Sequence, residues 1–346
     1  MLKKKIKSAY GRLRRRADRE SESQLLLLGK QMAWQAAALP ANIDLRRAGF
    51  KVFSQWDEDG IIQYLIHHIP IASRTFIEFG VENYEESNTR FLLLNDHWQG
   101  LVLDACSDDI DYIRFDRIHW QFDLQARQAW ITRANIDELL KSAGFGEDIG
   151  LLSIDLNGND YWIWQAIESV RPRIVVVEYN SLLGLQPLAV PYRDDFDRTA
   201  AHYSNQYYGS SLTALYRLAR GKGYILAGSN IWGHNAFFVR SDVAGSLRSL
   251  EPTEAYVASH FRDARDENGR LTYARERERF RLIEHLPVIN VETGEQGALR
   301  DMAEPGATAE PHIDEHARAS QARAVEAMID IERVADSPAA EAPANG

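Results

Sequence analysis

Short apolar segments alternate with amphipathic segments through the middle of the chain. The apolar segments have the length of strands and cover residues 75–79, 100–104, 128–132, 150–155, 173–178, 224–227 and 235–239. The segments between them carry apolar residues at helical spacing, over 88–95, 108–121, 136–142, 161–170 and 211–221. Strands that alternate with helices predict a mostly parallel sheet with helices on both faces. We therefore expect a doubly wound, Rossmann-like α/β sheet over residues 50–245, with an antiparallel hairpin at one edge formed by the last two strands.

The two ends of the chain differ from this middle part. Residues 1–19 carry nine Lys or Arg and one Asp, a net charge of +8, with apolar residues at helical spacing. They predict a basic helix within an N-terminal extension over 1–49, which either adheres to an anionic membrane or remains a solvated tail. Residues 246–300 predict a helical C-terminal extension. Residues 301–346 are rich in Ala, Glu and Pro and predict a mostly disordered tail.

Composition and charge narrow the class of protein. The chain has 346 residues, of which 45% are hydrophobic, and no apolar run approaches the roughly 20 residues that a membrane-spanning helix needs. The single cysteine, Cys106, excludes an internal disulfide and a cysteine-based zinc site, and favours a reducing, cytoplasmic location. Residues 20–346 carry a net charge of −18, so no basic surface for nucleic acid is expected. Any membrane contact would be peripheral, at the inner face, through residues 1–19.

Acidic residues follow four of the predicted strands. Glu78, Asp104, Asp155 and Glu178 stand at the carboxyl ends of strands. Ligands of doubly wound sheets bind outside these ends, so we expect the four carboxylates to border one ligand site. A single acid at a strand end is commonly a solvated cap, but four on one edge indicate a functional rim.

The loop after the first strand contains one glycine, Gly80. A dehydrogenase would carry the pattern G-x-G-x-x-G at this place, so a nicotinamide cofactor is disfavoured. Glu78 is placed to approach an ammonium group, and Asp104 to accept hydrogen bonds from both hydroxyls of a ribose. An acid before the glycine and a second acid after the next strand are features of S-adenosylmethionine binding.

Seven segments form a longer pattern. They are FSQWDEDG (53–60), FIEFGV (76–81), SNTR (87–90), SIDLNGND (153–160), VVEYN (176–180), YYGSSL (207–212) and NAFFV (235–239). In this order and spacing they resemble the FkbM-type class I methyltransferases, over about residues 50–240. The resemblance implies a seven-stranded methyltransferase sheet, S-adenosylmethionine as the methyl donor, and transfer of the methyl group to a hydroxyl of a sugar, glycan or glycolipid. Proteins with similar sequences commonly take part in the modification of glycans and polysaccharides.

The first loop departs from the family's pattern. Class I methyltransferases generally carry further glycines where this chain has Glu82 and Tyr84. Glycine adopts positive φ without strain, and Asn tolerates it. Asn83 can therefore take the left-handed conformation and the turn remains possible, but we expect the loop to be wider or shifted. The altered loop keeps a second hypothesis open, a non-catalytic Rossmann-like binding or scaffold module that has lost affinity for the cofactor.

Asp155 is the first candidate for the group that orients or deprotonates the acceptor hydroxyl, although it could simply cap the following helix. His234, before the last strand, and Glu178 are alternative bases. Asp155, Asp160 and Glu178 could instead hold a magnesium ion, which prefers carboxylate oxygens. A metal-free reaction is the favoured hypothesis.

Further cofactor candidates lie after the first and third strands. The backbone N–H groups of Asn88 and Thr89 begin a helix and favour the carboxylate of the cofactor, whereas Ser87 is the expected helix cap. Asn135 is a candidate for contact with adenine, or for capping its own helix. Residues 192–208 lack clear periodicity and predict a lid that grips the acceptor.

Overall fold

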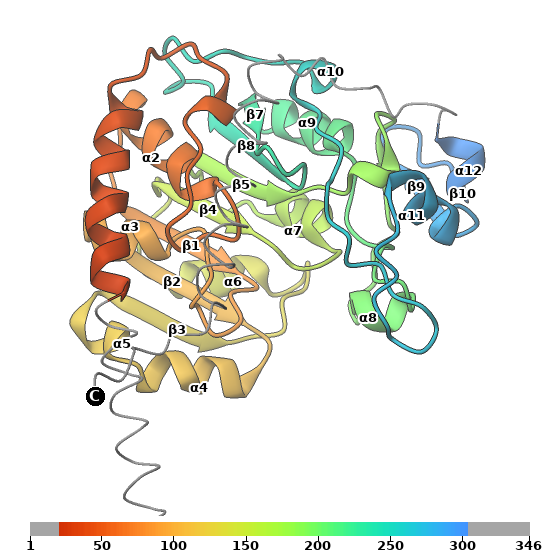
Figure 1. The fold of residues 1–346 in the computed structure, drawn as a ribbon, viewed down its shortest axis with the longest axis horizontal. Helices are drawn as coiled ribbons and strands as arrows, with labels where there is room; N and C mark the ends of the chain where they lie inside the picture. Colours follow the sequence, from red (N-terminus) through yellow and green to blue (C-terminus); the bar gives the residue numbers. More distant parts are fainter. Residues whose placement is uncertain (1–20, 304–346) are drawn as a thin grey trace, which may run out of the picture. The chain divides into compact units, whose positions relative to one another are not determined.

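The computed structural model describes residues 21–303. Seven strands form the main sheet in the order β3-β2-β1-β4-β5-β8-β7 (Figure 1). They are β1 Thr75–Phe79, β2 Gln99–Asp104, β3 Leu124–Gln128, β4 Leu151–Ile154, β5 Ile174–Glu178, β7 Tyr224–Ser229 and β8 Asn235–Arg240. Strands β1 to β5 run parallel to one another, and β8 runs antiparallel to both β5 and β7. The predicted doubly wound, Rossmann-like sheet with an antiparallel edge pair is confirmed.

Helices cover both faces of the sheet because successive residues of a buried strand point to opposite sides. In β1, Phe76 belongs to the core formed with α2, α3 and α4, and Ile77 to the core formed with α6, α7 and α9. Each large apolar side chain buried in these layers contributes roughly 1.5–3 kcal/mol. The main helices are α2 Glu58–His68, α3 Arg90–Asp96, α4 Ser107–Phe115, α5 Arg117–Gln121, α6 Ile136–Lys141, α7 Asp160–Ala166 and α9 Leu212–Gly221.

The strand order reverses between β1 and β4. From β1 the chain proceeds outward to β2 and β3, and then crosses back to β4 on the other side of β1. The loops after β1 and β4 therefore leave the sheet in different directions, which opens the crevice where such sheets bind ligands.

Residues 246–303 contain strands as well as the expected helices. Helices α10 (Pro252–Ala255), α11 (Glu276–Ile283) and α12 (Leu299–Met302) are accompanied by β9 (Pro287–Asn290) and β10 (Gln296–Ala298). These strands join β6 (Leu188–Ala189) in a second sheet of order β10-β9-β6. Val288 is buried in one apolar cluster with Leu188 and Ile283, which accounts for a strand where a helix was expected.

Two other predictions about elements need correction. Strand β3 covers Leu124–Gln128 rather than 128–132, because only Leu124 and Ala126 are buried on this edge strand and the apolar signal is weak. Helix α3 begins at Arg90 with Thr89 as its cap, so Ser87 is not the cap residue. Short elements fill other connections: η1 Leu45–Arg47, η2 Ser181–Leu183 and α8 Arg198–Ala201.

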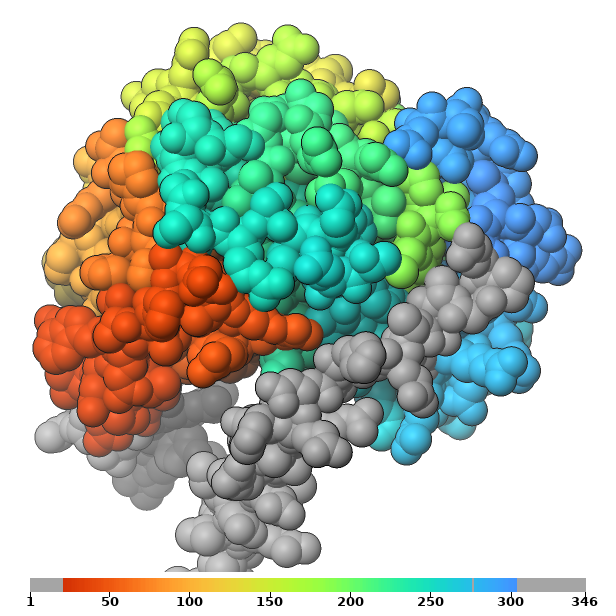
Figure 2. Space-filling model, turned by 90° about the horizontal axis from the view of Figure 1, so that it is seen from above, coloured from red at the N-terminus to blue at the C-terminus, as the bar shows by residue number. Residues whose placement is uncertain are grey.

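The described chain begins with a helix over residues 21–37. The N-terminal part of the chain lies against the segment around residues 230–260 in the space-filling view (Figure 2). Within residues 21–303, no helix is long and apolar enough to cross a membrane. The predictions for residues 1–19 and for most of 301–346 lie outside the described residues.

Candidate functional site

A cleft of about 420 Å³ opens at the carboxyl ends of β1, β2 and β4. The loops after these strands form one side, and residues 196–199 of the predicted lid, with Asn205, form part of the other. The cleft brings together three predicted site residues, Gly80, Asp104 and Asp155. The other predicted site residues do not line it: Glu78, Asn88, Thr89, Asn135, Asp160, Glu178 and His234.

Gly80 is required where the first loop passes the end of β4. Its φ is +69°, and a Cβ built there would lie 1.8 Å from the carbonyl oxygen of Asp155. Any side chain would therefore force β1 and β4 apart. This close approach brings the ends of β1 and β4 together at the point where the strand order reverses.

The rest of the first loop follows a path that glycine would normally take. Glu82 has φ of +46° and Tyr84 has φ of +62°, whereas Asn83 does not have positive φ. The left-handed positions of this loop are therefore Glu82 and Tyr84, and Asn83, which tolerates that conformation, does not take it. Left-handed conformations cost about 1–2 kcal/mol for residues with a Cβ. Burial of Tyr84, whose hydroxyl lies 2.9 Å from Thr89 Oγ1, helps to stabilise its conformation.

Asp104 lies at the floor of the cleft with acceptor capacity to spare. One oxygen accepts the N–H of Glu82 at 2.9 Å, and the other accepts the N–H of Cys106 at 2.8 Å. A carboxylate offers about four acceptor positions, so each oxygen can still accept a hydroxyl. The geometry fits the predicted contact with two neighbouring hydroxyls of a ribose.

Glu78 has a different role from the one predicted. Its buried carboxylate accepts hydrogen bonds from the N–H groups of Asn88 and Thr89, and from the hydroxyls of Ser87 and Thr89. The N–H groups that were expected to face a cofactor carboxylate are thus bound to Glu78. Burial raises the pKa of Glu78, and these donors oppose that effect. From β1, Glu78 thus satisfies the backbone N–H groups of Asn88 and Thr89, which immediately precede α3.

Asn135 neither lines the cleft nor caps its helix with its side chain. Its amide donates to the carbonyl oxygen of Trp130 at 2.9 Å and accepts the N–H of Thr132 at 2.8 Å. These bonds fix the loop after β3, and Trp130 and Ile131 of that loop line the cleft. Asn135 shapes the wall of the site without bordering it.

Three carboxylates converge after β4 and β5. One ligand atom each from Asp155, Asp160 and Glu178 lies within 4.8 Å of the others. Burial and the neighbouring Asp160 raise the pKa of Asp155 to about 7, and burial and Asp155 raise the pKa of Glu178. Asp160 is held by the N–H groups of Leu156 and Gly158. Asp155 Oδ1 and Glu178 Oε2, by contrast, have no hydrogen-bond partner among residues 21–303.

The same three carboxylates fit a hard divalent cation. Three oxygens at these separations, two of them without a partner, match the ligand preference of magnesium. A cation there would lower the pKa of a hydroxyl bound beside it.

Arg198, on α8, lines the same cleft as Asp155. Its guanidinium donates to Asp263 Oδ2 at 3.0 Å and to Asn157 Oδ1 at 3.1 Å, and stacks on the ring of Tyr208 at 3.8 Å. Its positive charge lowers the pKa of Asp155 and of Glu178, against the dominant effect of burial. The positive charge of Arg198, in the predicted lid over residues 192–208, is therefore attracted by the carboxylates of Asp155 and Glu178 at the strand ends.

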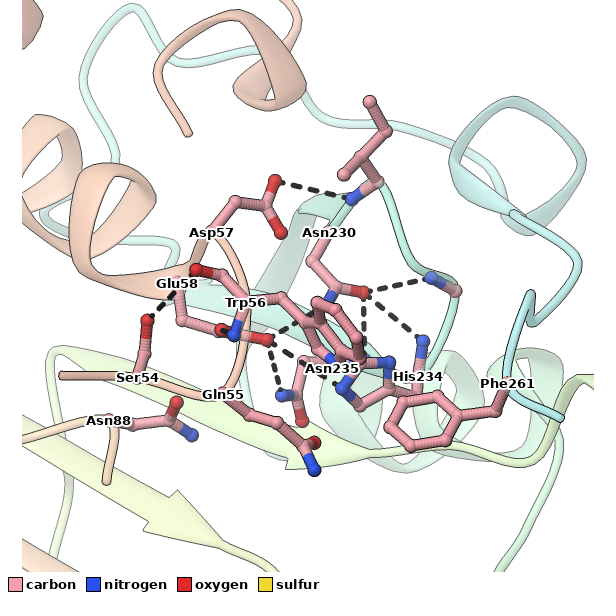
Figure 3. Close-up of polar contacts among 12 residues, drawn as sticks. Ser54, Gln55, Trp56, Asp57, Glu58, Asn88, Asn230, His234, Asn235 and Phe261 are labelled. Atoms are coloured by element: carbon pink, nitrogen blue, oxygen red, sulfur yellow. Dashed lines mark hydrogen bonds and ion pairs between the residues drawn. The ribbon is translucent and has the colours of Figure 1, made fainter. Parts of the chain in front are cut away.

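His234 lies beyond the cleft, next to the end of β5. Its carbonyl accepts the N–H of Tyr179 at 2.7 Å, and Asn235 pairs with Glu178 in the sheet. Its ring is buried next to the carboxylate of Glu58 on α2 (Figure 3). The structure thus places the third predicted base on the same rim, in an acidic environment.

Several residues of the site were not singled out from the sequence. Arg198 and Asp263 belong to irregular segments without a pattern that would mark them. Glu58 and Asn235 lie within the segments 53–60 and 235–239, so a search for polar residues inside those segments would have found both.

Comparison with known protein families gives no match, and no curated protein matches in sequence. Among solved structures, the chain resembles the O-methyltransferase from Bacillus cereus in complex with SAH, at 14% identity and a TM-score of 0.34, over 62% of this chain and 89% of that one. It also resembles the N-terminal domain of EvdMO1 with SAH bound, at 13% identity and a TM-score of 0.36, over 61% and 94% of the two chains. At such low identity the similarity concerns the fold alone.

Proposed function

We propose that the protein is an S-adenosylmethionine-dependent O-methyltransferase that acts on a hydroxyl of a sugar, glycan or glycolipid. The observation that carries the proposal is the cleft that joins Gly80, Asp104 and Asp155 at the reversal point of the sheet. The sequence of the chain resembles FkbM-type methyltransferases, and proteins of that type are associated with polysaccharide modification. This resemblance supports the choice of acceptor.

The residues of the cleft fit the cofactor in three respects. Asp104 has free acceptor positions for ribose hydroxyls. Gly80 lets the first loop pass so close to the end of β4 that a Cβ would lie 1.8 Å from the carbonyl oxygen of Asp155. Asp155 lines the cleft at the end of β4. When bound, S-adenosylmethionine supplies a methyl group on a positively charged sulfur.

Asp155 is the residue that orients the acceptor. Its carboxylate, which borders the cleft, accepts the hydrogen bond of the acceptor hydroxyl and so directs the hydroxyl oxygen toward the donor, as in-line displacement requires. Residues 192–208 close the acceptor side of the cleft, with Arg198 and Asn205 offering polar contacts to a hydroxyl-rich molecule.

Calorimetry with S-adenosylmethionine, S-adenosylhomocysteine and NAD tests the cofactor. We expect the first two to bind and NAD not to bind. Asp104→Ala should weaken binding by roughly 1.5–3 kcal/mol, the range for a hydrogen bond to a charged group. Asp108→Ala, which removes an exposed acid from α4, is the matched control and should bind normally. Absence of binding to all three compounds would favour the scaffold hypothesis.

Magnesium is tested in the same preparation. A metal-free reaction predicts that a chelator leaves methyl transfer from labelled cofactor to cell glycans unchanged. If Asp155, Asp160 and Glu178 hold magnesium instead, chelator should abolish transfer and added magnesium should restore it.

Peripheral contact with an anionic membrane is a second part of the proposal. The basic residues 1–19, with a net charge of +8, precede a helix over 21–37 whose exposed face carries both apolar and polar side chains. No acid occurs between Glu22 and Asp44, so nothing on this helix after its first turn repels anionic lipid. Five large apolar side chains of the helix are exposed: Leu25, Leu27, Leu28, Met32 and Trp34.

Vesicle sedimentation tests this contact. The protein should bind vesicles that contain phosphatidylserine more strongly than phosphatidylcholine vesicles, and less strongly at high salt. Replacing Leu27 and Trp34 by Gln should weaken binding. Replacing Leu271 and Tyr273, which are also exposed but belong to a segment on the opposite side of the molecule (Figure 1), should not. Equal loss in both variants would contradict the proposal.

A further inference from the structure

Arg198 is the only basic side chain among the described residues that line the cleft. The acids that line it are Glu82, Asp104, Asp155, Asp197 and Asp263. S-adenosylmethionine carries positive charges on its sulfur and its ammonium group, which such surroundings favour, and a carboxylate, which they repel. A carboxylate that leaves water for an acidic cleft needs a cation or several hydrogen-bond donors beside it.

Backbone donors near the cleft are already bound within the protein. The N–H groups of Asn88 and Thr89, which were expected to face the carboxylate, bind Glu78 at 2.9 and 3.0 Å. In the wall of the cleft, the N–H groups of Gly80 and Leu156 donate to protein acceptors at 2.9 and 2.7 Å. These four groups are therefore not available to a carboxylate of the cofactor.

Three neutral side chains of the cleft wall are occupied as well. Trp130 Nε1 donates to the carbonyl oxygen of Asp194 at 2.7 Å, and the amide of Asn159 donates to that of Arg193 at 2.8 Å. The hydroxyl of Thr199 donates to a neighbouring carboxylate at 2.6 Å. These donors hold the walls of the cleft together rather than facing a ligand.

Arg198, by contrast, has donors to spare. Its Nε donates to the carbonyl oxygen of Asn205 at 2.7 Å, and its terminal nitrogens donate to Asn157 Oδ1 at 3.1 Å and Asp263 Oδ2 at 3.0 Å. A guanidinium has five N–H donors, so within the described part of the chain one remains on each terminal nitrogen. The planar fork of a guanidinium matches the two oxygens of a carboxylate.

The guanidinium is held in place while it stays accessible. It stacks on the ring of the buried Tyr208 at 3.8 Å, and its three hydrogen bonds come from three different segments of the chain. The side chain of Arg198 nevertheless keeps 18% of its surface exposed and lines the cleft. A charged group that is fixed before the ligand binds loses little conformational entropy on binding.

The position of Arg198 suits the far end of the cofactor. Arg198 reaches Asn157, which follows Asp155 closely at the end of β4. The order β2-β1-β4 places Asp104 two strand spacings away, about 10 Å between backbones. The chain of single bonds between the ribose ring and the carboxylate of S-adenosylmethionine spans roughly 8 Å when extended. A cofactor whose ribose contacts Asp104 can therefore bring its carboxylate to Arg198.

We propose that Arg198 binds the carboxylate of the methionine part of S-adenosylmethionine; the inference rests on the proposed methyl transfer. The free N–H groups of its two terminal nitrogens donate to the carboxylate oxygens. The predicted lid over residues 192–208 thereby contributes Arg198 to the cofactor site, and Asn205 remains as its contact for the acceptor. An acidic group on the acceptor offers the same chemistry, so the test must separate the two ligands.

Calorimetry with two nucleosides tests the assignment without any turnover. The probes are S-adenosylhomocysteine and its decarboxylated form, which keeps the ammonium group and lacks only the carboxylate. The wild type should bind S-adenosylhomocysteine roughly 10- to 100-fold more tightly, because a bidentate Arg–carboxylate pair is a strong, charge-assisted interaction. Arg198→Gln should remove this difference by weakening only S-adenosylhomocysteine. Arg198→Lys keeps the charge but not the fork, and should restore part of it.

Arg193→Gln is the matched control. Arg193 belongs to the same lid, but its exposed guanidinium pairs with Asp195 and does not line the cleft. The control should bind both nucleosides as the wild type does. Circular dichroism and thermal unfolding show whether each variant folds. If Arg198→Gln does not fold, the ratio of the two affinities in the wild type and in Arg198→Lys decides the question.

The outcomes separate this inference from the proposed function. Equal affinity of the wild type for the two nucleosides would overturn the inference alone. Equal weakening of both in Arg198→Gln would also overturn it, because a loosened lid does not distinguish them. If Arg198→Gln weakened only an acceptor that carries glucuronic acid, the guanidinium would serve the acceptor instead. Absence of binding of either nucleoside to the wild type would overturn the proposed function, and the inference with it.

Discussion

Acids on the same edge of the sheet differ in how many hydrogen-bond donors surround them. At the end of β1, the carboxylate of Glu78 accepts hydrogen bonds from Ser87, Asn88 and Thr89. After β4 and β5, Asp155 and Glu178 each keep an oxygen without a partner among the described residues. Glu78 and Glu178 are similarly buried, so burial does not distinguish them. The difference lies in whether the fold supplies hydrogen-bond donors.

This difference separates a structural acid from a chemical one. A carboxylate saturated by backbone and hydroxyl donors stabilises a helix start and has little left to offer a ligand. A carboxylate that lies beside other acids and lacks hydrogen-bond donors destabilises the fold. It is available to bind a proton, a cation or a substrate. The comparison yields four predictions, in order of expected size.

The largest effect is expected from Asp155→Asn on turnover. The amide keeps the shape of the carboxylate but accepts a weaker hydrogen bond from the hydroxyl of the methyl acceptor. We expect a fall of roughly 10²- to 10⁴-fold in kcat with most cofactor affinity retained, measured with labelled cofactor. Glu78→Gln is the corresponding change in the saturated group and should alter stability more than kcat per folded molecule. Normal turnover in Asp155→Asn would remove it from the reaction.

Asp155→Asn should stabilise the fold in a pH-dependent way. The pKa of Asp155 is raised to about 7 in the folded protein, from an ordinary value of 3.8. Ionising it there costs free energy, so wild-type stability falls as pH rises between these values. The variant should be more stable by on the order of 4 kcal/mol near pH 8, and the difference should vanish near about pH 4. A difference independent of pH would contradict the raised pKa.

Glu78→Ala should destabilise the fold. It leaves the N–H groups of Asn88 and Thr89 and two hydroxyls without their acceptor. We expect the free energy of unfolding to fall by about 3 kcal/mol, measured by urea denaturation. A loss below about 0.5 kcal/mol, typical of surface substitutions, would contradict the structural assignment.

Glu82→Gly should give the smallest effect. Its φ of +46° is strained for a residue with a Cβ, so glycine should raise the free energy of unfolding by about 0.5–1 kcal/mol. Glu86→Gly, in the same loop but without positive φ, is the control and should be neutral or destabilising. A stabilisation by both would show that the strain at Glu82 is not the cause.

The order of strands and helices could be predicted because it depends on local patterns. Buried central strands such as β5, Ile174–Glu178, are continuous apolar runs, and their ends mark the rim where Asp104 and Asp155 lie. Strand β3 was misplaced because an edge strand buries only one face and its apolar signal is correspondingly weak. Strand β9 was missed because it pairs with β6, far away in the sequence, and β10 in turn pairs with β9.

The sequence by itself determined the mostly parallel sheet and the presence of acids at its strand ends, since these follow from hydrophobic periodicity and chain direction, whereas the order of the strands and the reversal point came from the structure. Only the tertiary structure decided which acids are free. The donors that saturate Glu78 come from the start of a helix on another segment. The amides that hold Glu58 come from residues 172 and 177 positions later in the chain. Hydrogen bonds of this kind depend on side chains that folding brings together, so they cannot be predicted from the local sequence pattern.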